Sequence, residues 1–220
     1  MKMEIWLVRH GETAWSLSGA HTSVTDIALT EHGRQRAVEL RDYLAGKTFA
    51  AVLVSPMSRA KDTCEIAGYG DVMVVDEDLR EWNYGEAEGK TTPEMRKIHG
   101  EDWSVWTSPI VGGEAGEAVG VRADKVIARA VAAMGAAVEP MSESPDPSAA
   151  LRAGYGHPQT SAVALFAHAH ILRILAARWI GLEAVGGKLF ALGTGSVSVL
   201  GFERETRVVV KWNRGFEAGE

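Results

Sequence analysis

The chain has 220 residues, 46% of them hydrophobic, with a net charge of -6 at pH 7 and a single cysteine. That length and apolar content suffice for the core of one domain covering residues 1–220. The acidic balance and the absence of a Lys/Arg run argue against nucleic acid or an anionic membrane as a partner. Cys64 has no partner for an internal disulfide, the quickly charged N-terminus does not resemble a signal peptide, and no apolar run approaches the roughly 20 residues that span a bilayer. We therefore expect a cytoplasmic protein.

Four short apolar runs predict strands that are covered on both faces, as in a mostly parallel sheet. These runs are residues 3–9, 50–55, 72–75 and 161–168. A helix is expected between the first two, with Thr30 as its N-cap and its end at Gly46. A second helix is expected to have Ser55 as its cap, Pro56 at its first position and Gly68 just past its end. The alternation predicts an α/β fold, in which helices flank the central sheet as a three-layer sandwich.

The second half of the chain continues this alternation, with one interruption. Helices are expected after Thr92 as cap and over residues 114–134. Residues 135–160 concentrate Pro, Gly, Ser and Ala, which predicts an irregular insertion rather than a domain boundary. A further helix follows the strand that ends at His168, and two final apolar runs predict a hairpin around residues 204–205. The hairpin is expected at one edge of the sheet, and exposed edge strands would permit a homodimer.

Ligands bind outside the carboxyl ends of the strands in an open parallel sheet, so the residues that follow each strand are candidates for chemistry. Guanidinium groups match phosphate oxygens, and helix N-termini near Ser55 and Ala169 would add backbone donors. Two arginines, two histidines and one glutamate at one rim would form a cationic pocket with a single acid, for which phosphate is the expected ligand. The candidates are Arg9, His10 and Gly11 after the first strand, Arg59 after the second, Glu81 after the third, and His168 and His170 after the fourth.

The segment LVRHGETAWS at residues 7–16 resembles the signature of the histidine phosphatase, or phosphoglycerate mutase-like, superfamily. The resemblance continues in family order through residues 25–37, 55–63, 79–89, 112–123 and 165–175, which is nearly the whole chain. It implies a phosphoglycerate mutase-like fold in which His10 is the nucleophile that takes up the phosphoryl group. Arg9, Arg59 and His168 would grip the phosphoryl oxygens. Glu81 would be the proton donor.

The chemistry of these side chains agrees with the roles that the resemblance implies. A neutral imidazole, with a reference pKa of about 6.5, is a nucleophile near neutral pH. Phosphoryl transfer needs mainly positioning and charge neutralisation, which two arginines and a protonated His168 would supply without a metal or another cofactor. Some members carry their acid directly after the second histidine, where this chain has Ala169, so the acid is expected to be Glu81. Apolar neighbours would raise its pKa and keep it protonated, and it would then activate the water that hydrolyses the phosphohistidine.

The expected reaction is hydrolysis of a small phosphorylated metabolite, such as a sugar phosphate. The alternative is a cofactor-dependent phosphoglycerate mutase, whose relatives carry a clamp of cations for a second acid group. This chain has Thr107 and Ser108 in place of the clamp arginines, although Lys90, Arg96 and Lys97 lie nearby in the sequence. The clamp is therefore expected to be absent, which favours a phosphatase.

Substrate contacts are expected from one loop and from the backbone of Ala169. Ser16 stands where the family usually has Asn, and its hydroxyl would still donate to phosphate. His21, Thr22 and Ser23 match positions where relatives contact the non-phosphate part of the substrate. A solvent-exposed loop is the alternative reading of these three residues.

Two other classes of function fit parts of the sequence. A metal-dependent hydrolase would use His168 and His170, because an H-x-H pair on a strand points both rings to one side. No third ligand has supporting spacing, so we expect no metal site, and we expect His170 to pack or hydrogen-bond in the first turn of its helix. A phospho-ligand sensor without turnover would need neither a nucleophile nor an acid. Of the tryptophans, only Trp82 and Trp106 fall where they would border the pocket.

Overall fold

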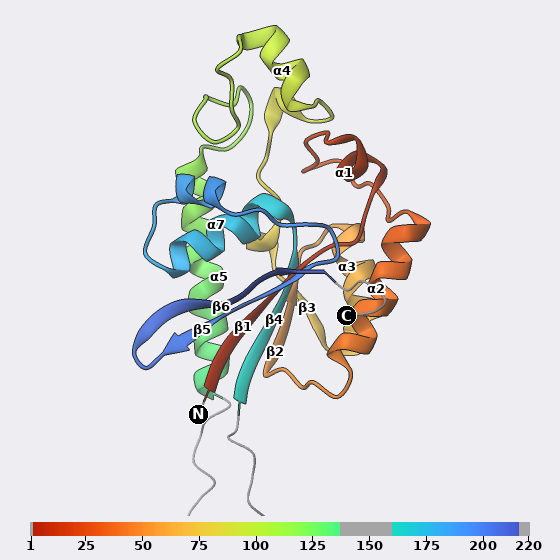
Figure 1. Ribbon diagram of the computed structural model, residues 1–220, viewed down its shortest axis with the longest axis vertical. Coiled ribbons are helices and arrows are strands. Elements are labelled where there is room, and N and C mark those ends of the chain that lie inside the picture. Colours follow the sequence, from red (N-terminus) through yellow and green to blue (C-terminus); the bar gives the residue numbers. More distant parts are fainter. Residues whose placement is uncertain (1, 137–159, 216–220) are drawn as a thin grey trace, which may run out of the picture.

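A six-stranded mixed sheet forms the centre of the molecule (Figure 1). The computed structural model describes residues 2–136 and 160–215. The strand order is β3-β2-β4-β1-β5-β6; the first four strands are parallel, and β5 and β6 form an antiparallel hairpin at one edge. The strands are β1 (Lys2–Arg9), β2 (Ala51–Val54), β3 (Met73–Val75), β4 (Thr160–Ala167), β5 (Val197–Glu203) and β6 (Thr206–Arg214). The mostly parallel sheet and its edge hairpin are as expected.

Helices cover both faces of the sheet, which makes the predicted three-layer sandwich (Figure 1). The alternation of β1 shows why: Trp6 and Val8 pack with residues of α2 and α3, whereas Ile5 and Leu7 pack with residues of α5 and α7. Because both faces are apolar, the strand reads as one continuous hydrophobic run. The helices are α1 (Ala14–Ser18), α2 (Glu31–Leu44), α3 (Ser58–Cys64), α4 (Thr92–His99), α5 (Gly116–Ala136) and α7 (Ala169–Trp179).

The N-termini of three helices show which of the N-cap predictions from the sequence are correct. Thr30 caps α2 as expected, since its hydroxyl accepts the Gly33 N–H at 3.0 Å. The expectation that Ser55 caps the next helix is wrong. The helix α3 begins only at Ser58, whose N–H is accepted by the carboxylate of Asp26 at 2.9 Å, and the Ser55 hydroxyl serves the candidate active site instead. Similarly, α4 is capped by Thr91, one residue before the expected cap.

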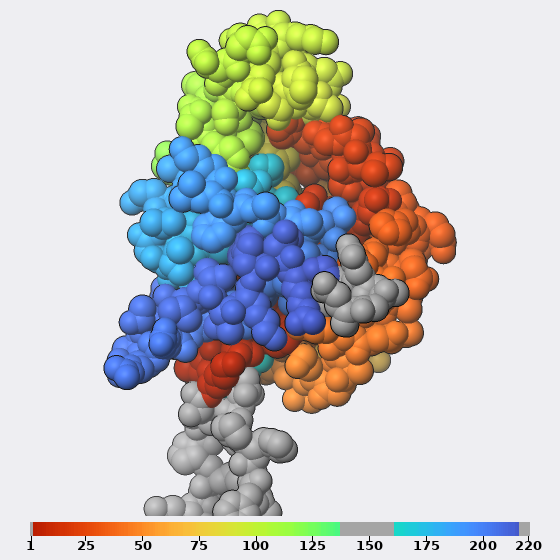
Figure 2. Space-filling model, in the orientation of Figure 1, coloured from red at the N-terminus to blue at the C-terminus, as the bar shows by residue number. Residues whose placement is uncertain are grey.

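The segment that carries α4 lies above the carboxyl end of the sheet (Figure 1), and it projects from the surface beside the segment of α1 (Figure 2). This segment connects β3 to α5, and it brings Glu81 and Trp106 to the rim where β1 and β4 end. None of the helices within residues 2–136 and 160–215 is long and apolar enough to cross a membrane. Residues 137–159 lie outside the described residues, so the irregular insertion expected there stays a prediction.

Candidate active site

The backbone at the end of β1 is held from three sides. The His10 N–H donates to Ala167 O of β4 at 3.0 Å, and the Gly11 N–H donates to the Thr63 hydroxyl of α3 at 3.0 Å. A Cβ atom at Gly11 would lie 2.4 Å from the carbonyl oxygen of Gly33, a distance that no side chain tolerates. Glycine at this position therefore serves backbone packing, which fixes where His10 points.

The imidazole of His10 is arranged as a neutral nucleophile. Its Nδ1 lies 2.7 Å from the Gly11 carbonyl oxygen. Because a carbonyl only accepts, Nδ1 carries the proton and Nε2 keeps its lone pair. Burial, followed by the charges of Arg9 and Arg59, lowers the pKa of His10 to about 3. The ring therefore stays uncharged at neutral pH.

Arg59 and His168 form a buried pair beside it. The Arg59 Nε–H donates to His168 Nδ1 at 3.2 Å, so the ring proton sits on Nε2, which lies 2.7 Å from the Ser55 hydroxyl. The rings of His10 and His168 are 5.2 Å apart, centroid to centroid. The expectation of a protonated His168 is wrong, because burial and the charge of Arg59 hold its pKa well below the usual range. The positive charge of the site comes from arginine.

The guanidinium of Arg9 uses only some of its hydrogen-bond donors within the described part of the chain. One of its terminal nitrogens donates to the Leu192 carbonyl oxygen, whereas its Nε is buried and has no hydrogen-bond partner in the described part of the chain. An unpaired buried donor is costly, and an anion would satisfy it. Arg9 also lines the cavity that contains His10. These facts suit a phosphate oxygen at this point.

Glu81 rests as a carboxylate on the N-terminus of α7. Its Oε1 accepts the N–H groups of Trp82 (3.0 Å) and Ile171 (2.9 Å), and its Oε2 accepts the N–H of His170 (2.9 Å). Burial raises the pKa of Glu81, but the hydrogen bonds and the neighbouring histidines outweigh burial and hold it well below its usual range. The expectation that apolar neighbours raise this pKa is therefore wrong. The resting group is a base, and it acts as an acid only after it has received a proton.

Tyr84 and His170 lie next to this carboxylate, and Trp106 packs behind His170. The Tyr84 hydroxyl lies 2.7 Å from His170 Nδ1, and that nitrogen is 3.8 Å from Glu81 Oε2. The His170 ring packs on Trp106, with centroids 4.9 Å apart. His170 thus hydrogen-bonds in the first helical turn, as predicted. Tyr84 was not predicted as a site residue, although it lies only three positions after Glu81.

A cavity of about 410 Å³ opens onto these groups. Arg173 lines it one helical turn after Ala169, with its guanidinium 4.6 Å from the centroid of the Trp106 ring. The spacing on α7 could have identified Arg173, but sequence reasoning missed it. The other lining residues are Arg9, His10, Ser16, Gly19, Ala20, His21, Thr22, Glu81, Tyr84, Thr92, Ser104, Val105, Ala169 and His170.

Most, but not all, of the predicted substrate-contact residues line this cavity. Ser16, His21 and Thr22 line it, as does Ala169. The Ser16 hydroxyl also caps α1 by accepting the Thr13 N–H at 2.8 Å, and it donates to the Thr13 carbonyl oxygen at 2.9 Å. His21 Nδ1 lies 2.6 Å from the carbonyl oxygen of Lys90. Ser23 does not line the cavity, because its hydroxyl donates to the Glu88 carboxylate at 2.6 Å.

Within residues 2–136 and 160–215, neither the cation clamp of a mutase nor a set of metal ligands around His168 and His170 is assembled. Lys90 and Arg96 donate to carbonyl oxygens of Glu86 and Trp103, and neither they nor Lys97 line the cavity. Trp106 borders the cavity as predicted, but Trp82 does not. The rings of His168 and His170 turn to Arg59 and Tyr84 respectively. Among the described residues, no group of three or more His, Cys, Asp or Glu side chains comes together as metal ligands would.

A buried neutral histidine lies near two arginines, of which Arg9 lines the cavity and Arg59 does not, and one carboxylate lines the same cavity at the carboxyl end of a parallel sheet. This arrangement suits phosphoryl transfer. The sequence profile described as "Histidine phosphatase superfamily (branch 1)" matches residues 5–138 and 148–215, and the chain belongs to this superfamily.

Individual relatives agree with this assignment. The chain is similar to an acid phosphatase of Mycobacterium tuberculosis, with 36% identity over 91% of this chain and 87% of the relative. It is also similar to sedoheptulose 1,7-bisphosphatase of Saccharomyces cerevisiae, with 31% identity over 80% of this chain and 67% of the relative. A solved structure of the product of an open reading frame from Mycobacterium tuberculosis superimposes with a TM-score of 0.79 and 32% identity, over 97% of this chain and 98% of that chain. The predicted family, the phosphoglycerate mutase-like fold and the class of enzyme, a phosphoric monoester hydrolase, are confirmed. The roles of individual residues remain predictions.

Proposed function

We propose that this protein hydrolyses a small phosphorylated sugar through a phosphohistidine formed on His10. The observation that carries the proposal is the His10 ring itself. Its Nδ1 is tied to Gly11 O, which leaves the Nε2 lone pair to face a cavity shared with Arg9 and Glu81. That arrangement provides a nucleophile, a counter-charge and a proton carrier around one phosphorus atom.

In the first step, Nε2 of His10 attacks phosphorus while the bond from phosphorus to the ester oxygen breaks. Arg9 and Arg59 neutralise the charge on the phosphoryl oxygens, and His168 holds Arg59 in place through its Nδ1. The departing alkoxide takes a proton from Glu81. A phosphate dianion that binds beside Glu81 raises the pKa of this carboxyl and lets it hold that proton in the complex.

In the second step, water attacks the phosphohistidine and the bond from phosphorus to Nε2 breaks. Glu81, now a carboxylate, takes the proton of the water as the new P–O bond forms. Inorganic phosphate leaves, and His10 regains its lone pair. Because Glu81 ends the cycle with the proton that it lost in the first step, the protons balance.

The cavity beyond the phosphate site supports a hydroxylated and anionic leaving group. The hydroxyl-bearing residues Ser16, Thr92 and Ser104 line it, and Arg173 is its second cation besides Arg9. These groups suit the hydroxyls and a second acid group of a sugar phosphate or bisphosphate. The relative named sedoheptulose 1,7-bisphosphatase supports the same substrate class.

The proposed partners and the proposed cytoplasmic location are supported by the net charge, the cysteine content and the exposure of one edge strand. The net charge of -6 supports a small-molecule partner and no nucleic acid or membrane. A single buried cysteine, Cys64, is in keeping with the cytoplasm. Val74 and Val75 are 59% and 48% exposed on the edge strand β3, which supports a homodimer paired there.

The test is release of inorganic phosphate in the presence of a chelator. The substrates are p-nitrophenyl phosphate, 3-phosphoglycerate and a series of sugar mono- and bisphosphates, each with the wild-type enzyme and with His10→Ala. We expect chelator-insensitive release that His10→Ala abolishes, with sugar phosphates ahead of phosphoglycerate. Undiminished release by His10→Ala would disprove the mechanism. Interconversion of 2- and 3-phosphoglycerate on addition of 2,3-bisphosphoglycerate, without phosphate release, would identify a mutase.

A further inference from the structure

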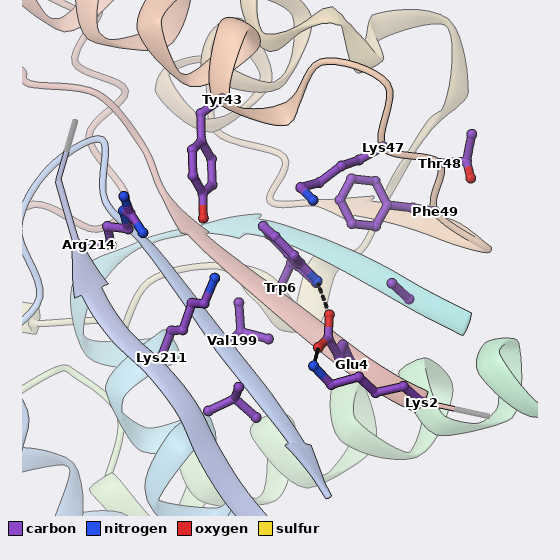
Figure 3. Close-up of a pocket in the computed structure, with 12 residues that line it drawn as sticks. Lys2, Glu4, Trp6, Tyr43, Lys47, Thr48, Phe49, Val199, Lys211 and Arg214 are labelled. Atoms are coloured by element: carbon purple, nitrogen blue, oxygen red, sulfur yellow. Dashed lines mark hydrogen bonds and ion pairs between the residues drawn. The ribbon is translucent and has the colours of Figure 1, made fainter. Parts of the chain in front are cut away.

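A second cavity, of about 590 Å³, lies on the α2 face of the sheet (Figure 3). It is bounded by β1, by the end of α2 with the loop that follows it, and by the β5–β6 hairpin. It shares no lining residue with the catalytic cavity and is the larger of the two. It is called the aromatic groove below. Its lining residues are Lys2, Glu4, Trp6, Tyr43, Lys47, Thr48, Phe49, Ala162, Val199, Val210, Lys211 and Arg214.

The floor of the aromatic groove is a cluster of aromatic rings. The Trp6 ring centroid lies 6.0 Å from that of Phe49 and 6.2 Å from that of Tyr43. The one carboxylate of the groove, Glu4, is already paired: it accepts the Trp6 indole N–H at 3.0 Å and lies 2.7 Å from the Lys2 ammonium. The floor is therefore apolar and carries no free negative charge.

The rim of the aromatic groove is cationic. Lys47, Lys211 and Arg214 are exposed, and none of them has an ion-pair partner among residues 2–136 and 160–215. Two of them lie over rings: Lys47 Nζ is 4.7 Å from the Trp6 centroid, and the Arg214 guanidinium is 5.5 Å from that of Tyr43. Figure 3 shows the head groups of Lys211 and Arg214 on the hairpin side of the opening and Lys47 on the opposite side. On a chain with a net charge of -6, this is a local excess of positive charge.

We propose that the aromatic groove binds a small organic anion that carries an aromatic ring, of the kind represented by a nucleoside monophosphate. The phosphate would lie among Lys47, Lys211 and Arg214, which together supply charge for a dianion that no single exposed lysine could hold. The ring would pack against Phe49, which is partly exposed beside the buried Trp6. The volume lies in the range of cavities that hold ligands of this size. The proposal does not depend on the activity at His10.

The test is binding of AMP measured by isothermal titration calorimetry. The protein is the full chain with His10→Ala, so that AMP is not turned over, in a buffer free of phosphate. The double variant Lys47→Glu/Lys211→Glu reverses two charges at the rim. Its matched control is Lys97→Glu/Lys125→Glu, which makes the same change of net charge at exposed positions that line neither cavity.

We expect the rim variant to weaken AMP binding at least tenfold and the control variant to leave it unchanged, with adenosine and phosphate alone each binding more weakly than AMP. Equal weakening of AMP binding by both double variants would mean that the affinity depends only on the net charge of the protein, which would overturn the proposal. So would an unchanged affinity in the rim variant, or displacement of AMP by a substrate of the catalytic cavity. Equal thermal midpoints would show that both variants are folded. Because no phosphate release is measured, failure here leaves the proposed function standing.

Discussion

The free enzyme is expected to keep His10 neutral far below the pH at which an ordinary histidine becomes protonated. Burial and the charges of Arg9 and Arg59 lower the pKa of His10 to about 3. At pH 5 an imidazole with a pKa of about 6.5 is roughly 3% neutral, whereas one with a pKa of about 3 is roughly 99% neutral. Acidification to pH 5 should therefore leave about 30-fold more neutral nucleophile than an unperturbed histidine would provide.

The charge state can be read directly by NMR of ¹⁵N-labelled histidines, with the spectrum of His10→Ala to assign the resonance. We expect no titration of His10 between about pH 8 and pH 4.5. The pH profile of kcat/KM reports the free enzyme and, once corrected for ionisation of the substrate, should show no enzyme limb near pH 6.5. A His10 midpoint within one pH unit of 6.5 would refute the inference that burial and two arginines keep the ring neutral.

Three further predictions concern neighbouring residues and stability. Glu81→Gln should lower kcat/KM, which reports the steps up to departure of the leaving group, by about 10²–10⁴-fold for alkyl phosphates and much less for p-nitrophenyl phosphate, whose leaving group needs no proton; an equal loss of kcat/KM for both substrates would contradict the role of Glu81 as proton donor. Gly11→Ala should destabilise the fold by about 1–3 kcal/mol in urea unfolding, because the new Cβ meets the Gly33 carbonyl oxygen at 2.4 Å, while Gly135→Ala, with open space around it, should not; equal effects would be inconsistent with this contact. Between pH 7 and pH 5 the unfolded chain gains a proton on His10 that the folded chain does not, so the wild type should lose about 2 kcal/mol more stability than His10→Gln. A pH dependence shared by both proteins would rule out this linkage.

The convergence of Arg9, His10, Arg59 and His168 could be predicted because it follows from strand order alone. Arg9 is the last residue of β1, His10 and His168 come directly after β1 and β4, and Arg59 lies in the first turn of the helix that follows β2. Parallel strands end at the same edge of a sheet. The apolar runs were readable because β1 and β4 are buried on both faces. The residues at which helices begin were harder to predict from the sequence. Ser55 has the residue type of a cap, yet its hydroxyl bonds to His168, which lies more than a hundred positions away.

The sequence by itself thus determined the family, the layers of the fold and the side chains that meet at the sheet edge. Only the tertiary structure decided their charge states. Glu81 is held as a carboxylate by backbone N–H groups of α7, and His168 is held neutral by the Arg59 Nε–H, and these contacts join segments far apart in the chain. Residue type defines a reference pKa, but burial and hydrogen-bond donors set the actual one, and both exist only once the chain has folded.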